Sequence, residues 1–487
     1  MGVDRVAPAR LTDDAPQRAG VHADVLAVFA VLWAFANLFH VWGPSGRATA
    51  VFDDVTTVAV THVVVGLLAV AVLVRPRSTA WLTALAVAGP VSFWFEAPVV
   101  GSHWALVCLV DLGILVAIVW TKGHDRVALE RRFVPFARVA LLGFYSFAAF
   151  SKLNSAFFTP RVSCGNYYFD ELAGSLHVTV HSATAGWWAH LVPIGTAGVE
   201  LSVPVLLLFP VTRRFGVVLG LVFHSLIALD QSHLFSDFSS VLTALFTLFL
   251  PAAFASDVVA RWRSLTDQAR ESVRTVVVVG ALALLGVQWY GHGKGLYRVF
   301  LDGRMWAWLL LDALVLVLVV HHLVATRTRR IDVPLRPQRW LWIVVALVVF
   351  NGAAPYLELR TAYAFNMYAN LVTAGGDSNH FIVRRTLPLT DDQRDLVAIV
   401  SSSDPGLEAY ATSKFDIPFL QLRDYLSHHR DVAVTYRRHG EVRTVAHAAD
   451  DPALVEPVPS WESKLFAFRS LDELDPPRCQ PAFLPAL

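Results

Sequence analysis

Lys152 is the residue whose type and setting in this sequence best suit chemistry. It follows the aromatic-rich run 144–150, in which Tyr145 would share its helical face, and it precedes Leu153 and Asn154. Apolar and aromatic surroundings disfavour the ammonium form and favour the neutral amine, which a lysine needs in order to act as a general base. The alternative is a lysine whose long side chain reaches a polar interface, and the position at the end of an apolar segment favours that alternative.

Other ionisable side chains lie inside apolar segments or at their ends, where burying a charge is expensive. They are Glu96, Asp111, Glu200, His224, Asp230 and Asp312. Glu200 is central in the apolar stretch 197–209 with no cation near it in the sequence, so it must find an interior partner, stay protonated or line a wet cavity. A lone histidine such as His224 is more often a hydrogen-bonding residue between helices than a catalyst.

Composition indicates which elements position these residues. Of the 487 residues, 55% are hydrophobic and 16% are charged, and the mean hydropathy is +0.50, which is far more apolar than a soluble globular chain. A membrane-spanning helix needs about 20 largely apolar residues. The sequence therefore predicts an all-α polytopic membrane bundle of about eleven transmembrane helices, with the segment at 133–151 the weakest because it contains Arg138. The expected spans are 24–42, 55–74, 78–96, 101–120, 133–151, 187–209, 215–230, 237–255, 275–291, 305–323 and 338–355.

The basic residues of the loops predict the orientation, because Lys and Arg are retained on the cytoplasmic side. Every second loop is basic, around residues 75–77, 122–132, 213–214, 261–274 and 327–339. This alternation predicts a multi-pass protein of the cell membrane with a cytoplasmic N-terminus and an extracytoplasmic C-terminal region. Membrane lipids are then its immediate partners. Nucleic acid is not expected as a partner, because the basic residues occupy short loops and form no broad face.

Three parts of the chain follow from this pattern. Residues 1–23 are polar and are expected to be a disordered cytoplasmic N-terminus, 24–355 form the transmembrane domain, and 356–487 form a small extracytoplasmic α/β domain. In the last part we expect β-like stretches and one amphipathic helix. The β-like stretches are 381–386, 395–401, a hairpin of 432–437 and 441–446, and 464–469, and the helix is 417–428.

The three cysteines are Cys108, Cys164 and Cys479, and they form neither a CxxC motif nor a Cys/His cluster. No zinc or other metal site is therefore expected. Cys108 lies inside a span, whereas Cys164 and Cys479 both fall on the extracytoplasmic side, where disulfides persist. We predict a Cys164–Cys479 disulfide that ties the C-terminal domain to the membrane part. The alternative is two free thiols, since sequence separation carries no geometric information.

Several motifs occur in the order found in a known family. The segment 148–158, with Lys152-Leu153-Asn154 at its centre, resembles the "aGxxKLnxxw" segment of the vitamin K-dependent gamma-carboxylase family and its bacterial relatives, the horizontally transferred transmembrane (HTTM) domain proteins. Glu200, the turn at 213–214 and His224 resemble the next two helices of that family. The segments 351–356, 364–371 and 378–380, which include Asn370 and His380, resemble its "NG…sPY…sxxMfSNL…sNH" region, and 417–423 and 465–469 fit its C-terminal domain.

The resemblance implies an activity. In the animal carboxylase, the lysine that corresponds to Lys152 deprotonates vitamin K hydroquinone, oxygen converts the quinol to a strong base and then to the epoxide, and carbon dioxide adds to peptide glutamate. The resemblance thus implies a quinol-epoxidising carboxylase, a lyase, that uses a reduced quinone such as vitamin K or menaquinone hydroquinone, O2 and CO2, with no metal. This chain has Ser151 and Asn154 where the animal enzyme has Lys and Asp, and His103 is the nearest group to its second essential histidine.

The candidate catalytic residues are accordingly Lys152, His103 and Asn154, and the candidate substrate-binding residues are Tyr145, Glu200, His224, Asn370 and His380. The expected substrate is a glutamate-containing secreted peptide. The alternative function is a non-enzymatic membrane protein that supports the maturation, binding or export of such a peptide. A transporter is less favoured, because the sequence has neither duplicated halves nor paired broken helices.

Overall fold

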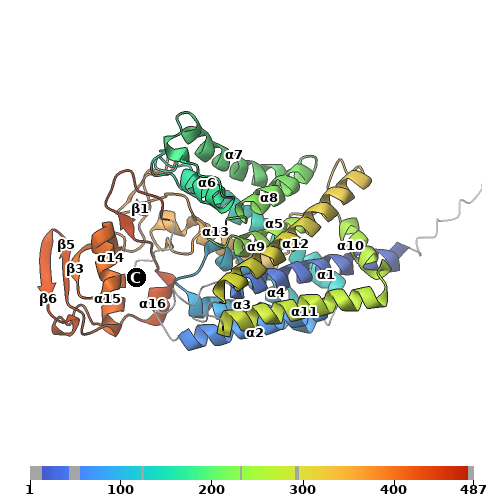
Figure 1. Ribbon diagram of the computed structural model, residues 1–487, viewed down its shortest axis with the longest axis horizontal. Helices are drawn as coiled ribbons and strands as arrows, with labels where there is room; N and C mark the ends of the chain where they lie inside the picture. The colour runs from blue at the N-terminus through green and yellow to red at the C-terminus, as the bar shows by residue number, and fades with distance from the viewer. Residues whose placement is uncertain (1–13, 43–54, 122–124, 231–232, 291–295, 481–487) are drawn as a thin grey trace, which may run out of the picture.

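The computed structural model describes residues 14–42, 55–121, 125–230, 233–290 and 296–480. A helical bundle fills one side of the molecule, and a small domain that contains a sheet covers one end of it (Figure 1). The N-terminal end of α1 points toward the opposite end of the bundle (Figure 1). The helices of the bundle and the short helix beside it are α1 (Asp14–Val41), α2 (Val55–Val74), α3 (Thr79–Glu96), α4 (Ser102–Val119), α5 (Arg126–Ser151), α6 (Cys164–Ser175), α7 (Trp188–Leu208), α8 (Arg213–Ile227), α9 (Ser236–Thr247), α10 (Ala252–Ser264), α11 (Asp267–Tyr290), α12 (Tyr297–Ala325) and α13 (Trp342–Ala353).

Seven helices in the described part of the chain are long and apolar enough to cross a membrane, or up to eight if the bent pair α9 and α10 counts as one span. The protein is therefore a membrane protein, but eleven spans are not confirmed. The expected span 237–255 is broken, because α9 and α10 meet at 109°. The expected span 215–230 corresponds to α8, which has only 15 residues. The apolar part of α11 is shortened by the charged residues of its first turns, from Asp267 to Arg274.

Helix α5 is continuous over 26 residues and lies in the core, despite the arginine inside it. Its first turn is capped by Asp125, whose side chain accepts hydrogen bonds from the amides of Val127 and Ala128. The buried guanidinium of Arg138 donates to the carbonyl oxygens of Leu248 at 2.7 Å and Pro334 at 2.9 Å. The segment 133–151 was expected to be the weakest span because it contains Arg138. These carbonyl acceptors satisfy the guanidinium inside the bundle, so Arg138 does not interrupt the helix.

The helix α1 begins at Asp14, ten residues before the expected span. Residues 1–13 of the expected disordered N-terminus lie outside the described residues, and residues 14–23 are helical. The apolar pattern identified the buried part of α1 but not its polar first turns.

The C-terminal domain is built on a five-stranded antiparallel sheet in the order β6-β5-β3-β4-β7. Its elements are β3 (Leu396–Ser402), α14 (Pro405–Ser413), β4 (Phe415–Pro418), α15 (Phe419–His428), β5 (Val434–Arg438), β6 (Glu441–Val445), α16 (Ser460–Leu465) and β7 (Leu471–Asp472). The strand expected at 395–401, the helix at 417–428 and the hairpin are present. The hairpin turns through His439 and Gly440, both of which have positive φ, as a tight two-residue turn requires.

Two expected strands are wrong. In the segment 381–386 only an isolated bridge joins Arg385 to Asp377, and the nearby strands β1 (Thr373–Ala374) and β2 (Asp377–Ser378) form a two-residue ladder. The segment 464–469 begins with the last two residues of α16 and continues as an irregular chain. There the carbonyl of Ala467 accepts the amides of both Thr361 and Ala362 at 3.1 Å. Hydrogen bonds to the chain that follows α13 therefore replace a strand in this apolar run.

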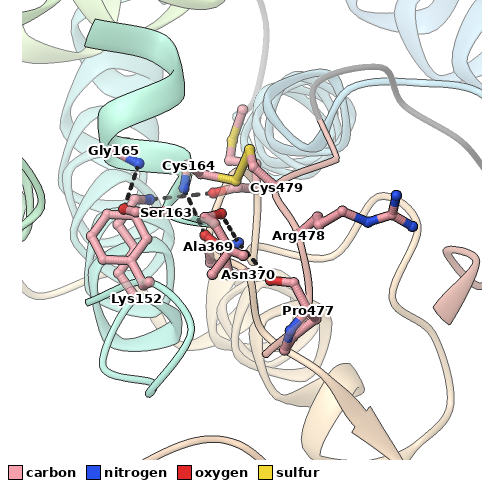
Figure 2. Close-up of a disulfide and its surroundings, with 12 residues drawn as sticks. Lys152, Ser163, Cys164, Gly165, Ala369, Asn370, Pro477, Arg478 and Cys479 are labelled. Atoms are coloured by element: carbon pink, nitrogen blue, oxygen red, sulfur yellow. Dashed lines mark hydrogen bonds between the residues drawn. A yellow bond between two sulfur atoms is a disulfide. The ribbon is translucent and has the colours of Figure 1, made fainter. Parts of the chain in front are cut away.

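The expected disulfide is present. Cys164, at the start of α6, is bonded to Cys479, with their Cα atoms 4.8 Å apart. Asn370 reinforces this junction, because its side chain accepts the amide of Cys164 at 2.8 Å and donates to the carbonyls of Val162 and Pro477 (Figure 2). The C-terminal segment is thus tied covalently to the loop that follows α5.

Candidate functional site

Lys152 occupies the C-cap of α5, and its side chain turns inward. Only 4% of the residue is exposed, and its Nζ atom donates to the carbonyls of Met367 at 3.3 Å and Ala148 at 3.4 Å. A lysine that serves as an interface anchor would extend toward solvent or headgroups instead. The anchor interpretation, which spacing favoured, is therefore wrong for this residue.

Glu200 is the partner of this buried lysine. Its Oε2 lies 2.8 Å from Lys152 Nζ, and its side chain is 14% exposed. The pair joins the end of α5 to the middle of α7, a helix at the outside of the bundle (Figure 1). Of the three possibilities left open for Glu200, the structure shows an interior partner, which is Lys152. Two opposite charges this close and this buried interact strongly as an ion pair.

Asn154 lies next to this pair and holds the chain in place. Its amide donates to the carbonyls of Ser151 at 2.8 Å and Ala369 at 2.5 Å, and its Oδ1 accepts the amide of Phe157 at 2.9 Å. The amide N–H groups of Asn154 are thus both used by backbone acceptors. This geometry suits a positioning residue, because Ala369 belongs to the same segment as Met367, which binds Lys152.

Tyr145 and His224 are hydrogen-bonded to each other. The Tyr145 hydroxyl lies 2.6 Å from His224 Nε2, and both residues are buried. The carbonyl of His224 also accepts a hydrogen bond from the Ser239 hydroxyl at 3.0 Å. These contacts join α5, α8 and α9, which is the interhelical hydrogen-bonding role expected for His224.

His380 is fixed in one tautomer by the backbone. Its Nδ1 accepts the amides of Ile382 at 3.1 Å and Val383 at 3.0 Å, so the proton resides on Nε2, which donates to the Phe150 carbonyl at 2.8 Å. Burial lowers the pKa of His380, and the hydrogen bond to Phe150 opposes this effect only in part. Asn370 and His380 therefore brace the segments around Lys152, and their polar atoms face protein groups.

A cavity of about 40 Å³ lies beside the disulfide. Its lining includes Cys164, Tyr368, Asn370, Arg469 and Asp472, all close to the junction of the two domains. This space is enough for about three water molecules but not for a quinone ring. It is thus a small gap at the junction and not a pocket that could hold a quinone ring.

His103 lies in a different cluster from Lys152. Its Nε2 is 3.0 Å from Asp237 Oδ2, which is also 3.1 Å from His40 Nδ1. His40, His62 and Asp237 were missed in the sequence, although histidines inside the spans 24–42 and 55–74 are a readable signal. The structure therefore separates the candidate residues into the Lys152–Glu200 pair with its braces, and a buried histidine–carboxylate cluster.

No protein-family model, curated protein or solved structure matches this chain.

Proposed function

We propose that this chain is a membrane enzyme resembling the gamma-carboxylases, in which Lys152 is the base for a reduced, lipid-soluble quinone and the final acceptor of CO2 is glutamate in a secreted peptide. The observation that carries the proposal is the buried contact between Lys152 and Glu200. It supplies a proton donor and acceptor pair, shielded from water, at the point where the membrane part meets the C-terminal domain.

The proton transfers follow from the contacts of Lys152. To act as a base, the ammonium must first lose a proton, and Glu200 Oε2 is the acceptor within reach at 2.8 Å. When the neutral amine then takes a proton from a substrate hydroxyl, the new ammonium is stabilised by the carbonyls of Met367 and Ala148. Glu200 thus receives or returns the proton, and the two carbonyls orient the nitrogen.

The surroundings of the pair support a substrate that arrives from the lipid. Helix α7, which carries Glu200, exposes Ile194, Val205 and Leu208 by 54%, 54% and 48% on its outer face. A prenylated quinone tail would lie along such a surface. The bound quinol would supply the reducing equivalents, with O2 as oxidant and CO2 as the second substrate.

Orientation is part of the proposal. We expect the N-terminus in the cytoplasm and the C-terminal domain outside, with Lys152 near the outer surface, and the alternating basic loops of the sequence support this orientation. A disulfide between Cys164 and Cys479 supports this orientation, because such bonds persist in oxidising compartments. In this arrangement the C-terminal domain meets a secreted peptide on the same side as the Lys152–Glu200 pair.

The competing function is a non-enzymatic membrane partner of a secreted peptide. One observation favours it, since the Lys152 ammonium already has an ion-pair partner in Glu200 and two carbonyl acceptors, Met367 and Ala148, and could serve only to hold helices together. Mass spectrometry of proteins secreted by cells with and without the chain separates the two functions. A gain of one CO2 on glutamate that depends on the chain supports the enzyme, whereas peptide binding to the purified protein with unmodified glutamate contradicts it.

A further inference from the structure

A cluster of three histidines and two carboxylates lies where five helices meet in the bundle. His40 is at the end of α1, His62 in α2, Glu96 at the end of α3, His103 in the first turn of α4, and Asp237 in the first turn of α9. His40, His62 and Glu96 are buried, while the side chains of His103 and Asp237 are 12% and 19% exposed. None of these residues takes part in the chemistry proposed for Lys152.

The contacts of Asp237 show which of these side chains face a common point. Its Oδ2 lies 3.0 Å from His103 Nε2 and 3.1 Å from His40 Nδ1, and the candidate ligand atoms of the three residues lie within 4.8 Å of one another. Within the described part of the chain, both ring nitrogens of His103 and Oδ1 of Asp237 are buried without a hydrogen-bond partner. The close contact between His103 and Asp237 is thus not directed as a hydrogen bond, and buried polar atoms in this state call for an explanation such as an ion.

We propose that His40 Nδ1, His103 Nε2 and Asp237 bind one divalent first-row transition metal ion. Two imidazoles and one carboxylate are a donor set typical of zinc and of non-haem iron. Ligands around such an ion at about 2.0 to 2.2 Å lie about 3.4 Å from each other when the geometry is tetrahedral. The contacts of 3.0 and 3.1 Å therefore need to open by only a few tenths of an ångström.

Glu96 supplies the support that a metal-binding histidine requires. Its Oε2 lies 2.9 Å from His40 Nε2 and accepts the proton on that nitrogen. The Nδ1 atom, which is hydrogen-bonded to Asp237 Oδ2 at 3.1 Å, then binds the ion once the ion has displaced the Nδ1 proton. Glu96 Oε1 accepts the Ser92 hydroxyl at 2.7 Å, and the Trp104 ring stacks on His40 with a centroid distance of 3.6 Å. Carboxylate, hydroxyl and indole together fix the plane of His40.

Space for His103 depends on a glycine. A Cβ atom on Gly101 would lie 2.5 Å from Cε1 of the His103 ring, closer than real contacts allow. His62, whose Nε2 lies 3.0 Å from Glu96 Oε1, could form a second set with His40 and Glu96. Both Glu96 oxygens have hydrogen-bond partners in Ser92 and His40, whereas Oδ1 of Asp237 has none among the described residues. The ligand assignment therefore favours Asp237 over Glu96, and the three ligands leave at least one position for water or a small ligand.

Metal content of the purified protein tests the proposal. Protein without a polyhistidine tag is treated with chelator, loaded with Co²⁺ or Zn²⁺, freed of excess ion and analysed for metal per chain. We expect about one equivalent in the wild type and in His62→Gln, and a loss of at least tenfold in His103→Gln and in Asp237→Asn. The matched control is His322→Gln, which removes another buried histidine, 2.6 Å from a carboxylate of Asp257, and should leave the metal content unchanged.

Three outcomes overturn the proposal: wild type that holds no more metal than Asp237→Asn, His103→Gln that retains the metal, or His62→Gln that loses it. A second measurement needs no variant, in case a substitution prevents folding. Binding to the folded state must raise the unfolding temperature of the wild type with Zn²⁺ but not with Mg²⁺, which prefers oxygen ligands. An equal response to both ions contradicts a site of this composition. A negative result in these metal-binding measurements does not contradict the role proposed for Lys152.

Discussion

Lys152 Nζ and Glu200 Oε2 lie 2.8 Å apart, on two different helices and almost entirely out of solvent. Burying two charges is unfavourable unless each neutralises the other. The same ion pair therefore affects both the stability of the membrane part and the base chemistry proposed for Lys152.

The pair should show strong coupling in stability. Glu200→Gln leaves the Lys152 ammonium buried with only carbonyl partners, so we expect it to lower the free energy of unfolding by about 3 to 5 kcal/mol. The double variant Lys152→Met with Glu200→Gln removes both charges and should recover much of this loss. Thermal unfolding in detergent, followed by tryptophan fluorescence, measures both. If the double variant were as destabilised as the sum of its two single variants, the residues would not be coupled.

The disulfide should make the C-terminal domain resistant to separation from the bundle. It closes a loop with a sequence separation of 315 residues, so its loss removes a large constraint on the unfolded chain. We expect Cys164→Ser to lower stability by about 2 to 5 kcal/mol. Alkylation before and after reduction checks the bond itself, with Cys108 as the internal reference for a free thiol. Alkylation of Cys164 and Cys479 without reduction would contradict the bond.

Topology can be read with an impermeant thiol reagent in intact cells. In a Cys108→Ala background, a cysteine at Ser401, which is exposed on β3, should react, and a cysteine at Arg263, which is near the end of α10, should not. The expected difference follows from the retention of basic loops in the cytoplasm. Permeabilised cells, in which both positions must react, provide the control. Labelling at 263 alone in intact cells would reverse the orientation.

His380 should make the junction sensitive to acid. Burial lowers its pKa below the ordinary value of 6.5, so the unfolded chain binds more protons than the folded protein as the pH falls toward and below that value. The stability that neutral His380 contributes is therefore present above about pH 6.5 and is lost as the pH falls through the folded-state pKa. We expect His380→Asn to be less stable than wild type at pH 7.5 but to lose less stability between pH 7.5 and pH 5.5. Unfolding temperatures at both pH values test this, and an equal loss in both proteins would exclude His380 as the source.

Much of the fold could be predicted from the sequence, because a spanning helix and a hairpin are local patterns. The apolar runs around α1, α2 and α12 and the His439-Gly440 turn are examples. The segment 464–469 was misassigned because the carbonyl of Ala467 accepts the backbone amides of Thr361 and Ala362, a long-range contact that no local pattern contains.

The site was less predictable, because its residues are brought together by long-range packing that no local pattern contains. Sequence indicated that Glu200 needed a partner but could not name Lys152, since only the packing of α5 against α7 brings them together. His40 and His62 escaped notice because a long apolar window hides a single polar residue. Clusters assembled from several helices become visible only when the helices are packed.

The most direct test of the central proposal is the rate at which purified protein in lipid nanodiscs consumes a reduced naphthoquinone, with O2, labelled CO2 and a glutamate-rich peptide present. Arg keeps its proton and cannot act as a base, so Lys152→Arg should lower the rate by about 100-fold or more without loss of folded protein. Lys464→Arg is the matched control, because Lys464 is also buried and donates to the Trp94 carbonyl at 2.7 Å, and it should keep the wild-type rate. A wild-type rate in folded Lys152→Arg would contradict the assignment of Lys152 as the base.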